Sequence, residues 1–300
     1  MNRRGTVRRG ERGMRRAGLW RSGRSAYDPA PYPLVRMGRS IVTAVPAALR
    51  RSAVALVLAA LGLMTNTTLY AADAYDAAVH HPGRTEADLK RDALDHPADV
   101  LRLAGIKPGM HVADLLAGDG YYSELVSYVV GPKGHVLLLN NGPFEKWSEG
   151  AWQPRVAHDR LPNVEHRVVE LEKLDLGTGT LDAIMLIKVY HDLYWVDTGT
   201  DWPKFNTSAV LDQIVRALKP GGVLVIVDHS ARPGTGTSVA STLHRIDEAN
   251  ARHDFESRGL KVAGSSDVLR RPEDARDQIS YKGPALGKTD RFVLVFRKPG

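Results

Sequence analysis

The feature that most constrains the fold is the stretch Val112-Ala-Asp-Leu-Leu-Ala-Gly-Asp-Gly-Tyr-Tyr-Ser123. Its apolar start predicts a short strand, Gly118 and Gly120 predict a tight turn, and the residues that follow predict a helix. Glycine has no Cβ, so this turn accepts positive φ angles and lets the backbone approach a ligand closely. Asp114, near the end of the strand, is placed to accept hydrogen bonds from that ligand. Gly-x-Gly turns are common, and a plain strand–turn–helix corner has the same pattern.

The remainder of the chain alternates strands with helices. We expect helices at 95–104, 120–130, 208–218 and, as one long polar helix, 238–258. The near-continuous apolar run at 181–188 is typical of a strand covered on both faces. The alternation predicts an α/β fold with a doubly wound, mostly parallel seven-stranded sheet and an antiparallel strand at the C-terminal end. The expected strands are 111–116, 134–139, 163–169, 181–188, 223–227, 260–263 and 291–297.

The charge and the cysteine count exclude several classes of function. The net charge is +7, but residues 1–74 hold 13 of the 41 Lys and Arg and only 3 of the 34 Asp and Glu. The other 226 residues therefore carry a balance of −3. Nucleic-acid binding needs clustered Lys and Arg on the folded part, so we predict no nucleic-acid partner. The chain has no cysteine, which excludes thiolate catalysis, disulfides and sulfur-ligated zinc.

The first 74 residues have the composition of a leader. Residues 1–36 are rich in Arg, Gly, Ser and Pro, and we expect a disordered basic segment, or an untranslated one if Met37 is the start. Residues 37–74 predict a signal peptide, with basic residues ahead of an apolar core at 52–64 and small residues at the cleavage site. The apolar core is too short for a stable membrane span. We therefore predict export, to the periplasm, or a cytoplasmic protein if the signal is not used.

Residues 75–94 are predicted to be an N-terminal extension, and residues 95–300 resemble the class I S-adenosylmethionine-dependent methyltransferases. The motifs that carry this resemblance are Asp114-Leu-Leu-Ala-Gly-Asp-Gly120, Leu181-Asp-Ala-Ile-Met185 and Leu218-Lys-Pro-Gly-Gly-Val-Leu-Val225. Four further segments are similar to a bacterial group of predicted exported methyltransferases. They are Tyr190-His-Asp192, Val227-Asp-His-Ser230, Leu243-His-Arg-Ile-Asp247 and Thr289-Asp-Arg-Phe-Val293.

The resemblance implies S-adenosylmethionine as cofactor and a Rossmann-like methyltransferase fold. It implies that Asp114, Ala117, Gly118 and Gly120 line the methionine part. An acid after the third strand, here Glu170, would meet the adenine amino group.

Two positions depart from the family pattern. Leu116 replaces the first glycine of the turn, which narrows the room near the cofactor. Asn140 stands where the family has a ribose-binding acid at the end of the second strand. An amide oxygen accepts from a hydroxyl without the charge assistance of a carboxylate, so we expect Asn140 to bind the ribose less strongly.

The candidate catalytic residues are Tyr190, His191 and Asp192, which follow the fourth strand. Ligands of open parallel sheets bind outside the carboxyl ends of the strands, so these side chains should open onto the site. Because methyl transfer to oxygen or nitrogen often needs a base, His191 is the candidate base and Asp192 its orienting group. The alternative is that His191 only caps a loop through the backbone.

A metal is not predicted. The set His191, Asp192, His229, His244 and Asp247 contains suitable ligands, but no pair has a strict metal-site spacing. His229 has the same two interpretations as His191, a base or a structural residue that caps a loop, and the structural one is slightly favoured. We expect His244, Arg245 and Asp247 to lie on the helix at 238–258. They would bind an anionic substrate if the first turn of this helix faces the site, and they would form a solvated face if it does not.

Four tryptophans flank the loops around the second and fourth strands, namely Trp147, Trp152, Trp195 and Trp202. They predict an aromatic wall for a planar or apolar acceptor, although core packing explains aromatic residues equally well.

The leading hypothesis is an enzyme that transfers a methyl group from S-adenosylmethionine to a small molecule or a component of the cell envelope. The alternative is a non-catalytic ligand-binding protein on a methyltransferase scaffold, which the substitutions at Leu116 and Asn140 favour. A nicotinamide-dependent oxidoreductase ranks lower, because the turn lacks a third glycine and the second strand lacks an acid at its end. The acceptor and the oligomeric state stay open.

Overall fold

The computed structural model describes residues 74–196, 199 and 201–300 of the 300-residue chain. The predicted basic leader and signal peptide lie outside the described residues. Within the described ranges, no helix combines the length and the apolar character that crossing a membrane requires.

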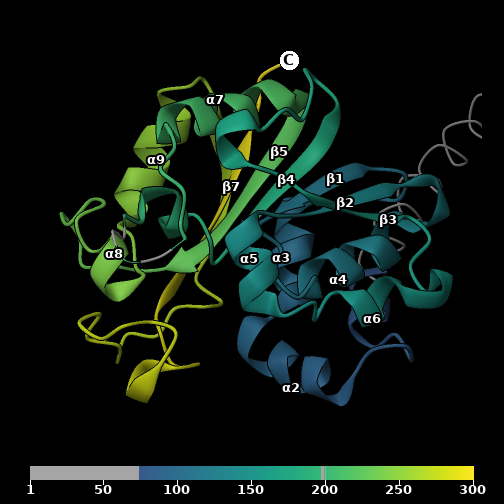
Figure 1. The fold of residues 1–300 in the computed structure, drawn as a ribbon, viewed down its shortest axis with the longest axis horizontal. Coiled ribbons are helices and arrows are strands. Elements are labelled where there is room, and N and C mark those ends of the chain that lie inside the picture. The colour runs from purple at the N-terminus through teal and green to yellow at the C-terminus, as the bar shows by residue number, and fades with distance from the viewer. Residues whose placement is uncertain (1–73, 197–198, 200) are drawn as a thin grey trace, which may run out of the picture. The chain divides into compact units, whose positions relative to one another are not determined.

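The described residues form a seven-stranded sheet in the order β3-β2-β1-β4-β5-β7-β6 (Figure 1). Strands β1 to β5 pair in parallel, and β7 pairs antiparallel with both β5 and β6. The predicted α/β class, the parallel sheet and the antiparallel C-terminal end are confirmed. The strands are β1 (His111–Leu115), β2 (His135–Asn140), β3 (Val164–Val168), β4 (Leu181–Ile187), β5 (Leu218–His229), β6 (Lys261–Ser266) and β7 (Arg291–Arg297).

Successive side chains of a strand point to opposite faces, and on the central strands β1, β2, β4 and β7 both faces are buried. On β1, Leu115 belongs to one hydrophobic cluster and Val112 to the other. The first cluster contains residues of α7 and α9, and the second contains residues of α3 and α4. The helices are α2 (Glu86–Asp95), α3 (Pro97–Ala104), α4 (Tyr121–Val130), α5 (Gly142–Ser148), α6 (Gln153–Val156), α7 (Thr207–Ala217), α8 (Ala240–Leu243) and α9 (Glu248–Glu256).

The carboxyl ends of β1 and β4 lie side by side at the centre of the sheet. Strand β1 pairs with β2 on one side and with β4 on the other, so the strand order reverses between β1 and β4. Ligands of open α/β sheets bind at such a reversal, outside the carboxyl ends of the strands. The loops after β1, β2, β4 and β5 are therefore the place to look for a site.

The single long helix expected at 238–258 is wrong. The structure has two helices, α8 and α9, with a break at residues 244–247. His244 takes the left-handed conformation (φ 48°), which ends α8, and the Asp247 side chain accepts from the Ala249 backbone N–H to start α9. Arg245, in the break, is fully buried.

Helix α2 was not expected, because its sequence is polar and has no apolar stripe. It begins at Thr85, whose side chain accepts from the Asp88 backbone N–H. Charge pairs hold it: Arg155 of α6 donates to both carboxylate oxygens of Asp88 at 2.8 and 2.9 Å. In Figure 1 the helix covers the lower side of the domain, beside α4 and α6.

Candidate functional site

The glycine turn after β1 is held tightly against the end of β2. Gly118 and Gly120 have φ angles of 61° and 76°. A Cβ on Gly120 would lie 2.7 Å from Cδ1 of Leu138, so only glycine fits there. The backbone N–H of Ala117 donates to the Leu139 carbonyl oxygen at 3.1 Å. The turn thus presents its backbone between the ends of β1 and β2, as the sequence predicts.

Asp114 lies in this junction and is 2% exposed. Ser123, in the first turn of α4, donates its hydroxyl to Oδ2 of Asp114 at 2.7 Å. Burial raises the pKa of Asp114 to about 7, against the lowering effect of the Ser123 hydrogen bond. A carboxyl group with a pKa this close to neutrality responds strongly to a nearby cation or hydrogen-bond donor.

Asn140 uses its side chain to fix the glycine turn. Its Oδ1 accepts from the Gly118 backbone N–H at 2.8 Å, and its Nδ2 donates to the Gly118 carbonyl oxygen at 3.0 Å and to Oε1 of Glu145 at 2.8 Å. The side chain of Asn140 therefore links the end of β2 to the glycine turn and to Glu145 of α5.

The neighbouring Asn141 has a free donor. Its Oδ1 caps α5 by accepting from the Phe144 backbone N–H at 3.0 Å. Its Nδ2 is buried and has no hydrogen-bond partner among the described residues. Oε1 of the exposed Glu170 lies 4.0 Å from the Cβ position of Gly142, the next residue along. A buried donor and an exposed carboxylate thus lie at the ends of β2 and β3.

Two non-glycine residues in the left-handed conformation flank the centre of the sheet. Leu116 (φ 57°) follows β1 and Lys188 (φ 60°) follows β4. Such backbone costs about 1–2 kcal/mol per residue and gathers at functional sites. The Leu116 side chain is buried in the hydrophobic core, so leucine at this position combines apolar packing with a strained backbone.

A cluster of charges lies beside Lys188. Its Nζ donates to Oδ2 of Asp95 at 2.9 Å, and Arg91 and Arg291 donate to the same carboxylate. Burial and the charge of Arg91 together lower the pKa of Lys188 to about 8, although the charge of Asp95 opposes this shift. Three cations therefore meet one buried carboxylate near the end of β4.

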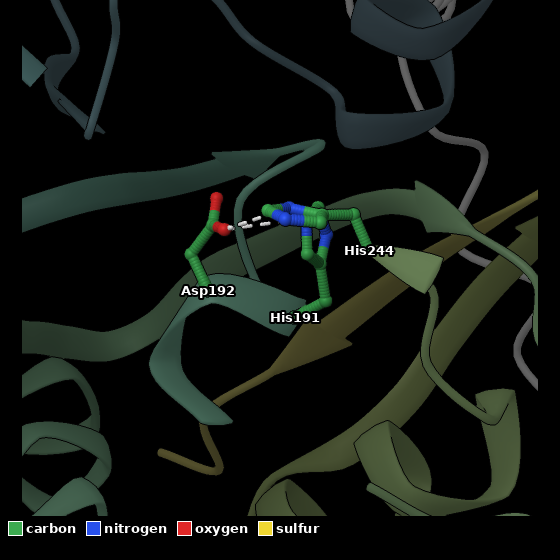
Figure 2. Close-up of side chains that lie close together, drawn as sticks. All are labelled: His191, Asp192 and His244. Carbon is green, nitrogen blue, oxygen red and sulfur yellow. Dashed lines mark hydrogen bonds and ion pairs between the residues drawn. The ribbon is translucent and has the colours of Figure 1, made fainter. Parts of the chain in front are cut away.

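His191 and Asp192 meet His244 at the carboxyl end of the sheet (Figure 2). Nε2 of His191 lies 3.3 Å from Nδ1 of His244 and 3.3 Å from Oδ1 of Asp192. Nδ1 of His244 lies 3.6 Å from Oδ1 of Asp192. The three residues come from the segment after β4 and from the break between α8 and α9.

Asp228, at the end of β5, orients His191. Its Oδ1 contacts Nδ1 of His191 at 2.8 Å, and its Oδ2 accepts from the His191 backbone N–H at 2.8 Å. Burial lowers the pKa of His191, but the charges of Asp192 and Asp228 outweigh it and raise the pKa to about 9. Without a bound cation His191 is therefore protonated at neutral pH, which argues against a free base.

The structure does not bring Tyr190 together with these residues. The Tyr190 hydroxyl donates to Asp254 and accepts from Nδ2 of Asn250 at 2.8 Å, and both partners belong to α9. The ring of His229 lies 6.1 Å from that of His191, and its Nδ1 is 2.8 Å from Oγ1 of Thr289.

Arg245 and Asp247 have structural contacts. Arg245 donates to Asp274 and to the carbonyl oxygens of Ser230 and Gln278. Asp247 caps α9. Neither residue forms the solvated face or the anionic-substrate site considered from the sequence.

Aromatic side chains connect the glycine turn with His244. Trp147 lies 3.2 Å from the Cβ position of Gly118, and its ring is 5.7 Å from that of Phe144. Successive ring distances of 5.9, 5.5 and 5.2 Å lead through Trp202 and Trp195 to His244. Trp202 belongs to the hydrophobic core and Trp195 packs against it, whereas Trp147 is exposed and Trp152 stacks on His166 at 3.6 Å. Core packing therefore accounts for Trp195 and Trp202, and the wall for an acceptor stays a prediction.

Two contributors to the site, the Asn141 amide and Glu145, carry no role predicted from the sequence. Asp228 follows the apolar strand expected at 223–227 and is expected from this place to open onto the site, but its contact with His191 comes from the structure. Asn141 directly follows Asn140, and the sequence does not indicate that the Asn141 amide is the one left without a partner. Glu145 had no signal, since α5 was not expected; it brings a carboxylate to the end of β2, where it accepts from Asn140, Trp152 and His166.

The strand order and the glycine turn define the fold of the class I S-adenosylmethionine-dependent methyltransferases. The structure is similar to a SAM-dependent methyltransferase from Aquifex aeolicus, with a TM-score of 0.50, 24% identity, and coverage of 69% of this chain and 92% of that chain. It is also similar to the cyclase SpnF, with a TM-score of 0.51, 14% identity, and coverage of 70% and 82%. These two likenesses concern the fold alone.

In sequence, the chain is similar to the ubiquinone/menaquinone biosynthesis C-methyltransferase UbiE of Hydrogenovibrio crunogenus, with 29% identity over 137 residues, 44% of this chain and 46% of that protein. The same enzyme of Vibrio vulnificus is 28% identical over 175 residues, 56% and 57% of the two chains. The chain thus spans about half the length of the curated relatives it matches. No family model matches the chain.

Proposed function

We propose that the chain is an S-adenosylmethionine-dependent methyltransferase that acts on a small molecule or a cell-envelope component. The observation that carries the proposal is the row of groups along the ends of β1, β2 and β3. It consists of the buried Asp114, the glycine turn, the free amide of Asn141 and the carboxylate of Glu170. The similarity to C-methyltransferases supports the same reading.

The cofactor supplies an electrophilic methyl group on a sulfonium sulfur. In the proposal, Asp114 and the backbone at Ala117 and Gly118 hold the methionine part. Asn141 donates to the ribose, and Glu170 accepts from the adenine amino group. Because methyl transfer is an in-line displacement, the main task of these residues is to align donor and acceptor.

The acceptor lies, in this proposal, on the side of β4 and β5. His191 and Asp192 are there, and the row from Trp147 to Trp195 provides an apolar wall for a planar molecule. Tyr190 is left out, because its hydroxyl is bonded to α9. Against the lowering effect of burial, the charges of Asp192 and Asp228 raise the pKa of His191 to about 9, which favours a role in positioning the acceptor over the role of base expected from the sequence.

We also propose that the protein is exported, because residues 37–74 have the composition of a signal peptide. Membership of the group of exported methyltransferases is part of the same proposal. Fractionation of cells that express the full chain tests this. A mature protein in the periplasm, shortened near residue 74, supports export. A full-length protein in the cytoplasm contradicts it.

A ligand-binding protein without catalysis is the second candidate. It is favoured by Asn140, whose amide is fully used within the protein. The likeness to a protein named a cyclase also illustrates that this fold alone does not define a reaction.

Calorimetric titration of the full chain with S-adenosylmethionine, and separately with NAD, tests the proposal. We expect saturable binding of S-adenosylmethionine only. Replacing Asp114→Asn removes the carboxylate, and Asn141→Ser keeps the cap of α5 but removes the amide donor. We expect Asp114→Asn to weaken binding about tenfold or more, since a hydrogen bond to a charged group contributes about 1.5–3 kcal/mol. We expect Asn141→Ser to weaken it about two- to tenfold, since a neutral hydrogen bond contributes about 0.5–1.5 kcal/mol.

Asp267→Asn is the control, because this side chain is 93% exposed and far along the chain from the site. Binding of NAD alone, or no binding by a folded sample, contradicts the cofactor assignment. Binding of S-adenosylmethionine without transfer to any acceptor in a screen of quinols, phenols and envelope lipids supports the second candidate.

A further inference from the structure

Three side chains at the end of the sheet converge on one point. Figure 2 shows Asp192 and the two imidazoles of His191 and His244 directed toward one another. Their facing atoms are Nε2 of His191, Oδ1 of Asp192 and Nδ1 of His244, with separations of 3.3, 3.3 and 3.6 Å. We propose that these three atoms bind a divalent transition-metal ion, with zinc as the best match.

The separations are those of a tetrahedral site. Zinc binds nitrogen and carboxylate oxygen at about 2.0–2.2 Å, which places two tetrahedral ligands about 3.3–3.6 Å apart. An ion about 0.7 Å out of the plane of the three atoms contacts all of them at these lengths. An octahedral magnesium site needs neighbouring ligands about 3.0 Å apart and prefers oxygen, so it fits less well.

The support around His191 is that of a metal-binding histidine. Its other nitrogen, Nδ1, lies 2.8 Å from Oδ1 of Asp228, a carboxylate that is fully buried. A hydrogen bond from Nδ1 to a carboxylate leaves the lone pair of Nε2 free for the ion and makes that nitrogen more basic. The second oxygen of Asp228 accepts from the His191 backbone, which fixes the ring further.

His244 is held by packing and by an unusual backbone. It has a left-handed φ of 48°, a conformation that costs energy outside glycine and gathers at functional sites. Its ring lies 5.2 Å from that of Trp195 and 4.6 Å from that of Tyr281. The side chain of His244 is 15% exposed, whereas that of His191 is 4% exposed. The ion would therefore be nearly enclosed, with access from the side of His244.

Three protein ligands leave a fourth position open, as in catalytic rather than structural zinc sites. The ligand chemistry suited to that position is an oxygen, from water or from a hydroxyl or carbonyl group of a bound substrate. His229 is not among the residues whose ligand atoms lie together, and its Nδ1 lies 2.8 Å from Oγ1 of Thr289. The ion would then hold and polarise an oxygen-bearing molecule beside the aromatic row.

Metal binding can be measured without any cofactor, so this proposal and the proposed methyl transfer fail independently. The purified full chain is stripped with a chelator and titrated with Zn²⁺, with Mg²⁺ and with Co²⁺. We expect one Zn²⁺ per chain, no heat with Mg²⁺, and a visible Co²⁺ spectrum of the intense four-coordinate type.

His244→Asn is the main variant, because asparagine tolerates the left-handed backbone and is too short to reach the ion. We expect it and Asp192→Ala to weaken Zn²⁺ binding at least a hundredfold. Asp228→Asn leaves all three ligands in place and should weaken binding about 10- to 100-fold. The matched control is His253→Ala, an exposed histidine on α9, which should bind as the unaltered chain does.

Thermal unfolding of each variant without metal verifies that it folds. Unchanged Zn²⁺ affinity in His244→Asn and Asp192→Ala, an equal loss in His253→Ala, or no binding by the unaltered chain would overturn the assignment. A weak six-coordinate Co²⁺ spectrum of the unaltered chain would also overturn it, and this readout needs no variant.

Discussion

Asp114 is predicted to make the protein less stable as the pH rises, and Asp114→Asn should remove this effect. The carboxyl group is 2% exposed, and burial raises its pKa in the folded state to about 7. In the unfolded chain its pKa is about 3.9. Between these values the folded protein keeps a proton that the unfolded chain releases. The stabilising contribution of the proton is therefore complete below about pH 4 and is lost as the pH rises through 7.

The magnitude follows from the shift of about three pKa units. Each unit corresponds to about 1.4 kcal/mol, so the full effect is about 4 kcal/mol, and about 3 kcal/mol of it falls between pH 5 and pH 8. Asparagine has the same shape, has no charge to bury, and can still accept the hydrogen bond from Ser123. The free energy of unfolding of Asp114→Asn, relative to the unaltered chain, should therefore increase by about 3 kcal/mol between pH 5 and pH 8.

Urea unfolding of both chains at pH 5 and pH 8 measures this double difference, in which the other titrating groups cancel. For a domain of this size the same quantity appears as a change of about 6–12 °C in the difference between the two Tm values. Asp267→Asn, at a 93% exposed position, should show no change with pH. A difference between Asp114→Asn and the unaltered chain that is the same at both pH values refutes the reasoning.

Three further substitutions test the site. Asn140→Asp introduces an acid at the end of β2 but places a carboxylate against the Gly118 carbonyl oxygen and Glu145. We therefore expect a loss of about 2–4 kcal/mol in urea unfolding and no tighter S-adenosylmethionine binding in calorimetry. Asp95→Asn leaves three neighbouring cations without their shared carboxylate and should lower the free energy of unfolding by about 3–5 kcal/mol; an unchanged value contradicts the importance of this cluster. Leu116→Gly relieves about 1–2 kcal/mol of strain from the left-handed backbone but loses about 2–5 kcal/mol of leucine packing. The free energy of unfolding in urea should therefore fall by about 2 kcal/mol, and a rise would mean that the strain outweighs the packing.

Much of the sheet could be predicted, because its buried strands are continuous apolar runs in the sequence. The strand expected at 291–297 has the same limits in the structure, and β4 differs from its expected range by one residue. Helix α2 escaped prediction because salt bridges rather than an apolar face hold it. The break between α8 and α9 escaped because His244 takes a backbone conformation that its sequence neighbours do not indicate.

The dependence on tertiary structure also limits how much of the site the sequence predicts. His191 and Asp192 were found from their place after an apolar strand, and Asp228 has the same signal. His244 comes 53 positions after His191, and only the tertiary fold brings the two rings to 5.3 Å. A metal-site pattern based on close spacing along the chain cannot detect such a pair. Asn140 and Asn141 show a second limit, since the sequence does not indicate which amide the turn uses.

The place of β7 in the sheet has a consequence for synthesis on the ribosome. Strand β7 lies between β5 and β6, so seven registered residues of β5, 223–229, await a partner that is translated last among the strands. At about 5–20 residues per second, the 68 residues from the end of β5 to the end of β7 take about 3–14 s to add. During that time the nascent chain presents the unpaired edge of an apolar strand, the kind of surface that joins strands of other chains. A chain interrupted before Arg291 keeps this edge open and should aggregate rather than form a smaller domain.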